Sequence, residues 1–489
     1  MPAAVTAEFL TKPRRVRSPT GSSFLGGLQL HATYTDDPRK RITRPNDARI
    51  VDSPQGVIPG SPPAAGPQSR SVPPTQAECV EAFAAPCYQP AQIQTAYNVQ
   101  PLFASGITGA GQTIVIVDPF GSPTMQADLT TFDGQFGLPA PPSFRVIQPA
   151  GAVPPYDPAN TDMVGWAGET TLDVEWAHTM APGASILLVE TPVSETEGTA
   201  GFPQIVRAEN YVIDHHLGGV MSQSFSATEE TFPTAQSLLD LRSAYINAYQ
   251  QGMTVLAASG DSGSTDVNLD ETLFYTHPVT SWPDSDPLVT GVGGTELQLN
   301  DAGDRTAPDQ VWNDTYNAAV NEATFGNSGP NPLAGGGGKS VIFSRPWYQN
   351  GVADAVGDQR GVPDIALSAA CSGLVDIYQS FGGEPAGWYP SCGTSEATPL
   401  FAGIVALGDQ VAHHSLGLIN PTLYALSAEH APGLVDITRG NNTVSFTQNG
   451  MFDTVPGFNA GSGYDLASGV GTVDAALFVP ELARAAGGR

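Results

Sequence analysis

The chain has 489 residues, of which 48 are Asp or Glu and 20 are Lys or Arg, so its formal net charge is −28. Such an excess of negative charge excludes nucleic acid and anionic membranes as partners, because both are bound through basic surfaces. With 40% hydrophobic residues the chain is too apolar to be disordered throughout, and its length allows a sizeable core.

The charge is unevenly distributed along the chain. Residues 1–75 are rich in Pro, Gly and Ser and contain ten basic and five acidic side chains, which leaves 10 basic and 43 acidic residues for positions 76–489. The composition of this basic leader is typical of a disordered tail. The alternative is a short pro-segment that pairs with the acidic remainder by charge. We expect residues 76–489 to form the folded domain.

The cysteines and the N-terminal region bear on the cellular compartment. No run approaches 18 apolar residues, as a membrane span would require, and no signal peptide is evident in the first 30 residues. Four cysteines form two local pairs, Cys79/Cys87 and Cys371/Cys392, and neither pair has the spacing of a metal site. They form either two disulfides, which suit a secreted protein, or buried thiols. We expect a secreted protein.

From about residue 85, short apolar runs alternate with helical patterns. Continuous apolar strands separated by helices indicate an α/β fold with a mostly parallel central sheet and helices on both faces. The predicted strands are Thr113–Val117, Ser185–Val189, Gly219–Phe225, Thr254–Ser259 and Leu288–Gly293, and the predicted helices are Glu169–Met180, Gln204–His216 and Ala235–Gln251. The four-glycine loop Gly335–Gly338 lacks the frame of a phosphate-binding loop.

The first candidate for chemistry is a pair of acids, Glu169 and Asp173. Four residues apart on a helix, they project from one face. Two close carboxyl groups resist double ionisation, so one of them keeps its proton to a higher pH than a free acid does. Acids at this spacing are also common on solvated helix faces, and the pair alone does not decide between these interpretations.

The second candidate is Asp261, which follows a predicted strand in the sequence Ser259-Gly-Asp-Ser-Gly263. In α/β folds, functional residues gather at the carboxyl ends of strands. Asp261 either caps the next element or, when protonated, donates a hydrogen bond to an oxyanion. The same residues imitate the Gly-Asp-Ser-Gly of trypsin-like proteases, and Trp176-Ala-His178 imitates their histidine motif, but those enzymes are all-β barrels.

The third candidate is Ser395, in the sequence Gly393-Thr-Ser395 with Pro399 opening an apolar helix. A serine at a helix N-terminus lies where backbone N–H groups and the helix dipole favour negative charge, and it is either a nucleophile or a helix cap. A nucleophilic serine needs a base. None of the eight histidines stands in the His-Gly-Thr frame of a subtilisin.

Glu169/Asp173, Asp261 and Gly393-Thr-Ser395-x-x-x-Pro399 together resemble the sedolisin family of serine-carboxyl peptidases. Further matches occur in the family's order, from about Tyr88 to Gly471 and over about four-fifths of the chain. They are Tyr88–Gln92 (YQPAQ), Leu172–Gly183 (LDVEWAHTMAPG), Gly291–Thr295 (GVGGT) and Gly361–Asp364 (GVPD). The resemblance implies a subtilisin-like fold and activity at acidic pH, with glutamate replacing histidine.

The resemblance also implies roles for individual residues. Ser395 would attack the scissile carbonyl, and Glu169 would accept its proton and return it to the leaving amine. Asp173 would hold and tune Glu169, and protonated Asp261 would bond the oxyanion. Asp118 falls where some relatives carry a glutamate hydrogen-bonded to the catalytic one.

Two other parts of the chain acquire meaning from the resemblance. A calcium site is implied at Asp436, Ile437, Gly461, Gly463 and Asp465, and carboxylates with backbone carbonyls are suitable hard-oxygen ligands. Ser224 and Phe225 stand where many relatives have Ser-Trp, which marks them as candidates for substrate binding. The stretch between Asp436 and Gly461 is longer than usual for the family.

We therefore expect a secreted, calcium-binding, acid-acting endopeptidase that is a monomer and acts on proteins or peptides. Two alternatives stay open: a tripeptidyl-aminopeptidase of the same family, and an inactive sedolisin-like binding or scaffold protein. The presence of all four residues Glu169, Asp173, Asp261 and Ser395 argues against the inactive protein, which has no chemical need for them.

Overall fold

The structure is a computed structural model that describes residues 72–383 and 385–486, all of which fall within one compact unit. The basic leader predicted at residues 1–75 therefore lies outside the described residues, apart from its last four positions. Within the described part of the chain, no helix combines the length and the apolar character that are needed to cross a bilayer.

The core is an eight-stranded sheet with the strand order β10-β9-β7-β5-β2-β4-β3, in which β13 also pairs with β9. All of its pairs are parallel except β10 with β9. The strands are β2 (Thr113–Pro119), β3 (Phe144–Ile147), β4 (Ser185–Thr191), β5 (Val220–Gln223), β7 (Thr254–Ala258), β9 (Thr290–Glu296), β10 (Gln310–Val311) and β13 (Ile365–Ser368). The prediction of an α/β fold with a mostly parallel sheet is confirmed.

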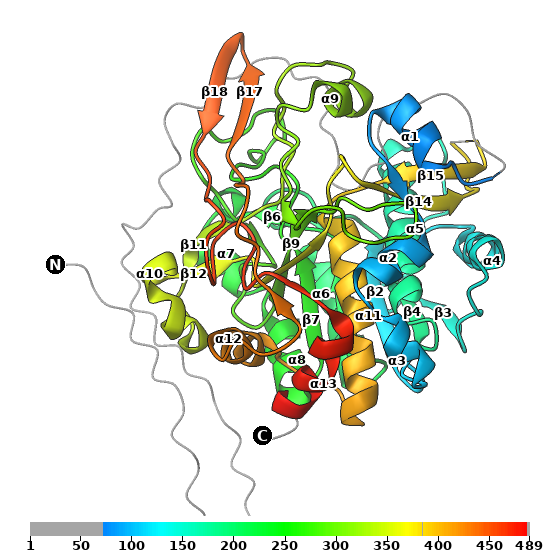
Figure 1. Ribbon diagram of the computed structural model, residues 1–489. Helices are drawn as coiled ribbons and strands as arrows, with labels where there is room; N and C mark the ends of the chain where they lie inside the picture. Colours follow the sequence, from blue (N-terminus) through cyan, green and yellow to red (C-terminus); the bar gives the residue numbers. More distant parts are fainter. Residues whose placement is uncertain (1–71, 384, 487–489) are drawn as a thin grey trace, which may run out of the picture. The chain divides into compact units, whose positions relative to one another are not determined.

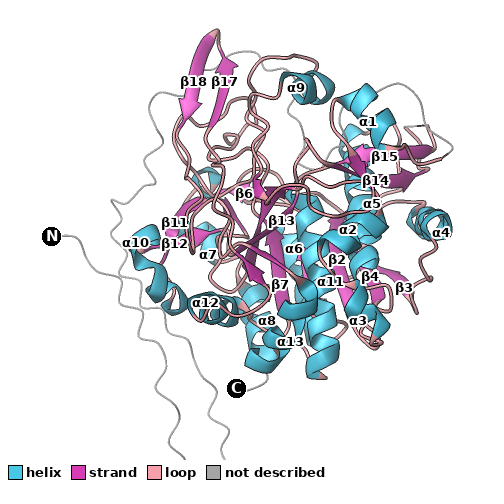
Figure 2. Cartoon of the chain, viewed as in Figure 1, coloured by secondary structure: helices cyan, strands magenta, loops and turns pink. Residues whose placement is uncertain are grey.

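Helices cover both faces of this sheet (Figure 1, Figure 2). Along β2, Ile114 and Ile116 join one apolar cluster and Val115 and Val117 join the other, as the alternation of side chains along a strand requires. The first cluster includes α5, α11 and α13, and the second includes α6 and α8. The helices are α1 (Gln76–Phe83), α2 (Pro90–Ala96), α3 (Gln100–Ala104), α4 (Met125–Phe136), α5 (Thr161–Met180), α6 (Phe202–Asp214), α7 (Ala235–Leu239), α8 (Ser243–Gln251), α9 (Ala318–Phe325), α10 (Ala353–Val356), α11 (Thr394–Ala412), α12 (Asn420–Ala428) and α13 (Ala475–Ala486).

Several predicted boundaries are wrong. The helix predicted at Glu169–Met180 begins at Thr161, because the side chain of Asn160 caps it by accepting hydrogen bonds from the first-turn N–H groups of Asp162 and Met163. The helix predicted at 235–251 is two helices, α7 and α8, separated by a turn at residues 240–242. Strand β5 ends at Gln223, two residues before its predicted end.

A smaller three-stranded sheet, with the order β1-β14-β15, leads the chain into α11. Its last strand ends at Ser391, three residues before the helix begins. The long stretch after Asp436 contains the hairpin β17–β18, whose base contacts the loop that follows β7 through a hydrogen bond from the N–H of Ser264 to the carbonyl of Asn442. The strands outside the central sheet are β1 (Cys87–Tyr88), β6 (Ala227–Thr228), β8 (Ser281–Trp282), β11 (Gly338–Ser344), β12 (Gln359–Val362), β14 (Leu374–Gln379), β15 (Gly387–Ser391), β16 (Leu434–Val435), β17 (Val444–Gln448), β18 (Met451–Val455) and β19 (Thr472–Val473).

Candidate active site

Three of the predicted site residues lie at or just beyond the carboxyl ends of three neighbouring strands of the sheet. Asp118 lies at the end of β2, Ser224 directly follows β5, and Asp261 lies three residues beyond β7. Because these strands are parallel and adjacent, their carboxyl ends meet at one edge of the sheet. Glu169 and Asp173 project from α5, and Ser395 is the second residue of α11. The fold thus brings the sequence-predicted residues into one region.

A buried set of acids extends from α5 to the end of β2. The hydroxyl of Ser224 donates a hydrogen bond to Oδ1 of Asp173 at 2.9 Å, which fixes that carboxyl group. Burial raises the pKa of Asp173 well above its usual value, and the negative charges of Asp118 and Glu169 raise it further. Burial also raises the pKa of Asp118 to about 7, the nearby Thr170 and Asp173 side chains lower it, and the charge of Glu190 raises it. Within the described residues neither oxygen of Asp118 has a hydrogen bond of standard geometry, and Asp118 acts on Asp173 and Glu169 by its charge.

Glu169 is the base candidate, and Ser395 lies beside it. Burial raises the pKa of Glu169 well above its usual value, the Ser395 hydroxyl lowers it, and the charges of Asp118, Asp261 and Glu195 raise it. Within the described residues, neither carboxyl oxygen of Glu169 has a hydrogen bond of standard geometry. The contact with Ser395 is thus not a closed hydrogen bond, and catalytic pairs without a bound substrate are often long or poorly aligned.

Asp261 is held by the residue that precedes Ser395. Oδ1 of Asp261 accepts hydrogen bonds from the backbone N–H of Thr394 at 2.7 Å and from its hydroxyl at 2.8 Å. Burial raises the pKa of Asp261 to about 6, the two bonds from Thr394 lower it, and the charge of Asp266 raises it. A carboxyl group in this state is protonated under acidic conditions and is then able to donate a hydrogen bond.

The start of α11 supplies further polarity. Gly393 is the N-cap residue with φ of 120°, a backbone conformation that favours glycine, and a Cβ atom there would lie 2.6 Å from Oδ2 of Asp261. The first N–H groups of a helix have no partner within it, so the N–H of Ser395 faces outward with the positive end of the helix dipole. Pro399 lies inside the helix and does not open it, which corrects the prediction.

The other predicted residues near the site are less directly connected to it. Phe225 is 4% exposed and packs its ring edge-on against Phe202, with the ring centroids 6.3 Å apart, so its contact with a substrate stays a prediction. His178, which imitates a protease histidine in the sequence, is buried and contacts Asp133 at 3.3 Å and the carbonyl of Pro139 at 2.8 Å. The two contacts join α5 to α4 and to the loop that follows α4.

The residues of the predicted calcium site converge on one turn. Oδ2 of Asp436 accepts a hydrogen bond from the N–H of Gly463 at 3.0 Å, and Oδ2 of Asp465 accepts one from the N–H of Gly461 at 2.9 Å. Ile437 is buried in a small apolar cluster, which anchors the segment that carries Asp436. Two carboxylates thus meet one glycine-rich turn, and carboxylates with backbone carbonyls are the hard-oxygen ligands that calcium takes.

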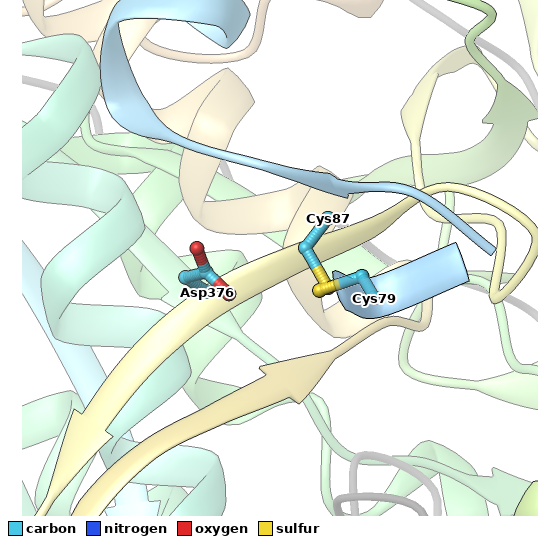
Figure 3. A group of neighbouring side chains, drawn as sticks. All are labelled: Cys79, Cys87 and Asp376. Carbon is cyan, nitrogen blue, oxygen red and sulfur yellow. A yellow bond between two sulfur atoms is a disulfide. The ribbon is translucent and has the colours of Figure 1, made fainter. Parts of the chain in front are cut away.

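The four cysteines are bonded in the two local pairs, Cys79–Cys87 and Cys371–Cys392. Figure 3 shows the first disulfide joining α1 to β1, with the carboxyl group of Asp376 close by. Sulfur atoms that are joined in a disulfide are not thiolates, so this group of three residues is not a metal site. The second disulfide closes a loop that ends one residue before Gly393.

Sequence reasoning missed three contributors to the site. The contact between Thr394 and Asp261 spans 133 residues, and only the motif Gly393-Thr-Ser395 hinted at it. Glu195, in the loop after β4, has a pKa raised by burial to about 8 and acts on Glu169 by its charge. Asp266, near Gly260, acts on Asp261 in the same way. Nothing in the sequence marks these two acids among the chain's many others.

Comparisons with known proteins place this site in context. A scan against models of known protein families finds no match. Kumamolisin of Bacillus sp. is 32% identical over 392 residues, which cover 79% of this chain but only 62% of kumamolisin. Tripeptidyl-peptidase sed5 of Aspergillus fumigatus is 28% identical over 334 residues, which cover 65% of this chain and 51% of that protein. The solved structure of Pseudomonas sedolisin, a serine-carboxyl proteinase with two bound molecules of pseudo-iodotyrostatin, aligns with a TM-score of 0.66 and 26% identity over 82% of this chain and 99% of its own.

Proposed function

The chain belongs to the sedolisin family of serine-carboxyl peptidases, and from that premise we propose that it is an acid-acting endopeptidase. The observation that carries the proposal is that Ser395 lies beside the buried Glu169, while a second carboxyl group, Asp261, is held against the same helix terminus. In this proposal residues 76–489 form the peptidase domain and residues 1–75 form a leader.

Attack on the substrate begins with a proton transfer. The Oγ atom of Ser395 attacks the carbonyl carbon of the scissile bond as its proton moves to Glu169. In acid Asp118 and Asp261 are protonated, so their charges no longer raise the pKa of Glu169, which makes the ionised form that accepts the proton easier to reach. Ser224 holds Asp173 in place throughout.

The tetrahedral intermediate carries a negative oxygen that needs donors. Protonated Asp261 and the backbone N–H of Ser395 would supply them, and one such donor typically lowers the barrier by about 3 kcal/mol. Glu169 then returns its proton to the leaving amine, which breaks the peptide bond and leaves an acyl group on Ser395. Water attacks this ester with Glu169 again as the base, which frees the carboxylic acid product and restores Ser395.

The pH dependence tests this assignment. We expect hydrolysis of denatured protein between about pH 3 and 5 and its loss as the pH rises past about 6, because Asp261 then gives up the proton that it must donate. The measurement is the release of soluble peptides from one substrate across pH 3–8. Activity that is undiminished at pH 8, in a protein shown to be folded there, would remove Asp261 from its role.

The alternative is a tripeptidyl-aminopeptidase, and the similarity to tripeptidyl-peptidase sed5 supports it. A peptide with an acetylated N-terminus separates the two activities, because an aminopeptidase needs a free amine and an endopeptidase does not. We expect cleavage of the blocked peptide. Failure to cleave blocked, free and denatured protein substrates alike would favour the inactive binding protein.

We also propose a calcium ion held by Asp436 and Asp465 with the carbonyls of Ile437, Gly461 and Gly463. When bound, the ion would neutralise the two carboxylates and tie the turn at residues 461–465 to the segment at 436–437. The meeting of both carboxylates at the turn of Gly461 and Gly463 supports this arrangement.

Removal of the ion tests the calcium proposal. A ligand that binds only the folded state stabilises it, so chelation should lower the unfolding temperature by several degrees, and added calcium should restore it. The variant Asp465→Asn should show the lower temperature without a chelator and little response to calcium. Asp354→Asn, an exposed acid on α10, is the matched control and should respond as the parent does. An unfolding temperature that is independent of calcium would contradict the site.

The remaining parts of the proposal concern location and partners. We propose secretion, supported by the two disulfides, which persist in oxidising compartments. The substrates would be proteins or peptides, and the enzyme would act as a monomer. The net charge of −28 disfavours nucleic acid and anionic membranes as partners.

A further inference from the structure

The two oxygens of the Asp261 carboxyl group have different surroundings. Oδ1 accepts two hydrogen bonds, from the backbone N–H and from the hydroxyl of Thr394. Oδ2 lies against the Cα of Gly393, where a Cβ atom would come within 2.6 Å. This second oxygen is thus next to the backbone that leads into Ser395, and the close approach is possible because residue 393 has no side chain.

The hydroxyl of Thr394 donates a hydrogen bond to Asp261. Its Oγ1 accepts a hydrogen bond from the backbone N–H of Gly260 at 3.1 Å, so the remaining donor capacity of the hydroxyl is directed at Oδ1 of Asp261. Oδ1 therefore faces two donors. A proton on Oδ1 would point at these donors and repel them. A proton on Oδ2 leaves the two hydrogen bonds from Thr394 and the one from Gly260 intact.

Resting on the proposed function, we propose that Thr394 is a positioning residue that keeps the proton of Asp261 on Oδ2, the oxygen that donates to the oxyanion. In this role Thr394 acts through Asp261. The hydroxyl both selects the oxygen that carries the proton and prevents the carboxyl group from turning.

A purely structural role for Thr394 makes different predictions. Thr394 is also the first residue of α11, and its methyl group lies near Gly294. Thr394→Val keeps the shape and the methyl group and removes only the hydroxyl. Thr394→Ser keeps the hydroxyl and removes the methyl group. If only packing matters, Thr394→Ser should lower activity more than Thr394→Val does. If the hydroxyl matters, Thr394→Val should lower activity more.

The first experiment compares steady-state kinetics of the parent, Thr394→Val and Thr394→Ser on one peptide at pH 4. Loss of a whole oxyanion donor costs about 10²- to 10³-fold in kcat, and because Asp261 itself remains we expect a fall of about 10- to 100-fold for Val. We expect KM to change less than about twofold, since the interaction is made in the transition state. Thr394→Ser should retain most of the parental kcat.

Two further readouts address the proton itself. The affinity for a peptide aldehyde, whose adduct with serine carries an oxyanion-like oxygen, should fall in Thr394→Val by about the same factor as kcat. The hydrogen bond from the hydroxyl lowers the pKa of Asp261, so its removal should raise that pKa and move the alkaline limb of the kcat profile to higher pH. A change in packing alone would not lower the aldehyde affinity by the same factor as kcat. It would also leave the alkaline limb of the kcat profile where it is.

The outcomes separate this inference from the proposed function. If the parent does not hydrolyse peptides, or Ser395→Ala hydrolyses them equally well, the proposed function fails. If the parent is active and Thr394→Val equals it in kcat and pH profile, only the role of Thr394 is overturned. Equal defects in Val and Ser with lowered unfolding temperatures also overturn it. Should Thr394→Val not fold, Thr394→Ala is the second hydroxyl-free variant, and the same comparison with Ser applies.

Discussion

Replacement of Ser395 by Ala, or of Glu169 by Gln, should lower kcat for peptide hydrolysis at pH 4 by at least about 10⁴-fold, as loss of a nucleophile or its base does in serine peptidases. Ala has no hydroxyl to attack with, and Gln fills the space of Glu169 without being able to accept a proton. Because the two residues act as a unit, the double variant should be no slower than the worse single variant. The measurement is steady-state hydrolysis of one peptide.

The control for this prediction is Glu209→Gln, a change of the same chemistry in a buried glutamate on α6. Glu209 belongs to the helix layer on the far side of the sheet from α5, so its substitution should leave kcat at pH 4 unchanged. Substantial activity in Glu169→Gln, with the Ser395→Ala variant inactive, would show that another group takes the proton of the serine.

The second prediction is that the fold is most stable in acid and loses stability as the pH rises from about 5 to 8. Several carboxyl groups outside the site are also fully or almost fully buried, and burial raises the pKa of Glu209 and Glu396 to about 8 and that of Asp409 to about 7. In the unfolded chain these groups ionise near pH 4. Below that pH these groups are protonated in both the folded and the unfolded state, so they do not lower the free energy of unfolding.

Between the pKa of these groups in the unfolded chain and their higher pKa in the folded chain, the unfolded state loses protons that the folded state keeps. Each rise in pH within this range therefore favours unfolding. One pKa unit corresponds to about 1.4 kcal/mol, and a buried glutamate with pKa of about 8 therefore costs several kcal/mol of stability by neutral pH. The measurement is the unfolding temperature from pH 3 to 8, which we expect to fall throughout the upper half of this range.

Glu209→Gln provides a specific test of this account. One oxygen of Glu209 accepts a hydrogen bond from the amide of Gln223, and the other has no partner among the described residues. The amide that the substitution introduces cannot ionise, so the variant should unfold at a higher temperature than the parent at pH 7.5 and at nearly the same temperature at pH 4. An equal effect at both pH values would mean that the charge of Glu209 is not responsible.

The sequence predicts the strands of this fold better than its helices, for a physical reason. Strands such as Thr113–Pro119 are buried on both faces, and a short apolar run with turn residues on each side identifies them. Helix α5 is also buried almost all round from Trp166 onward, but the buried polar residues between Glu169 and Asp173 interrupt its apolar residues, so periodicity alone does not mark where the helix begins. Its start depends on the Asn160 cap.

The site divides in a similar way. The pair Glu169/Asp173 is predictable because both residues lie on one helix at a fixed spacing, and Ser395 because its motif precedes an apolar helix. The surroundings of Asp118 are not predictable, since its nearness to both Asp173 and Glu169 depends on how α5 lies against β2. The contact of Thr394 with Asp261 also requires the three-dimensional arrangement of β7 and α11.

The close packing of α5 against α11 has a consequence for how the protein fails. Gly403 on α11 lies so near α5 that a Cβ atom there would come within 2.5 Å of the Cβ of Met180, and both helices are buried along most of their length. These two helices carry the base and the nucleophile. Their amide protons should therefore exchange with solvent only when the whole domain opens, and catalytic competence should disappear together with the fold and not before it.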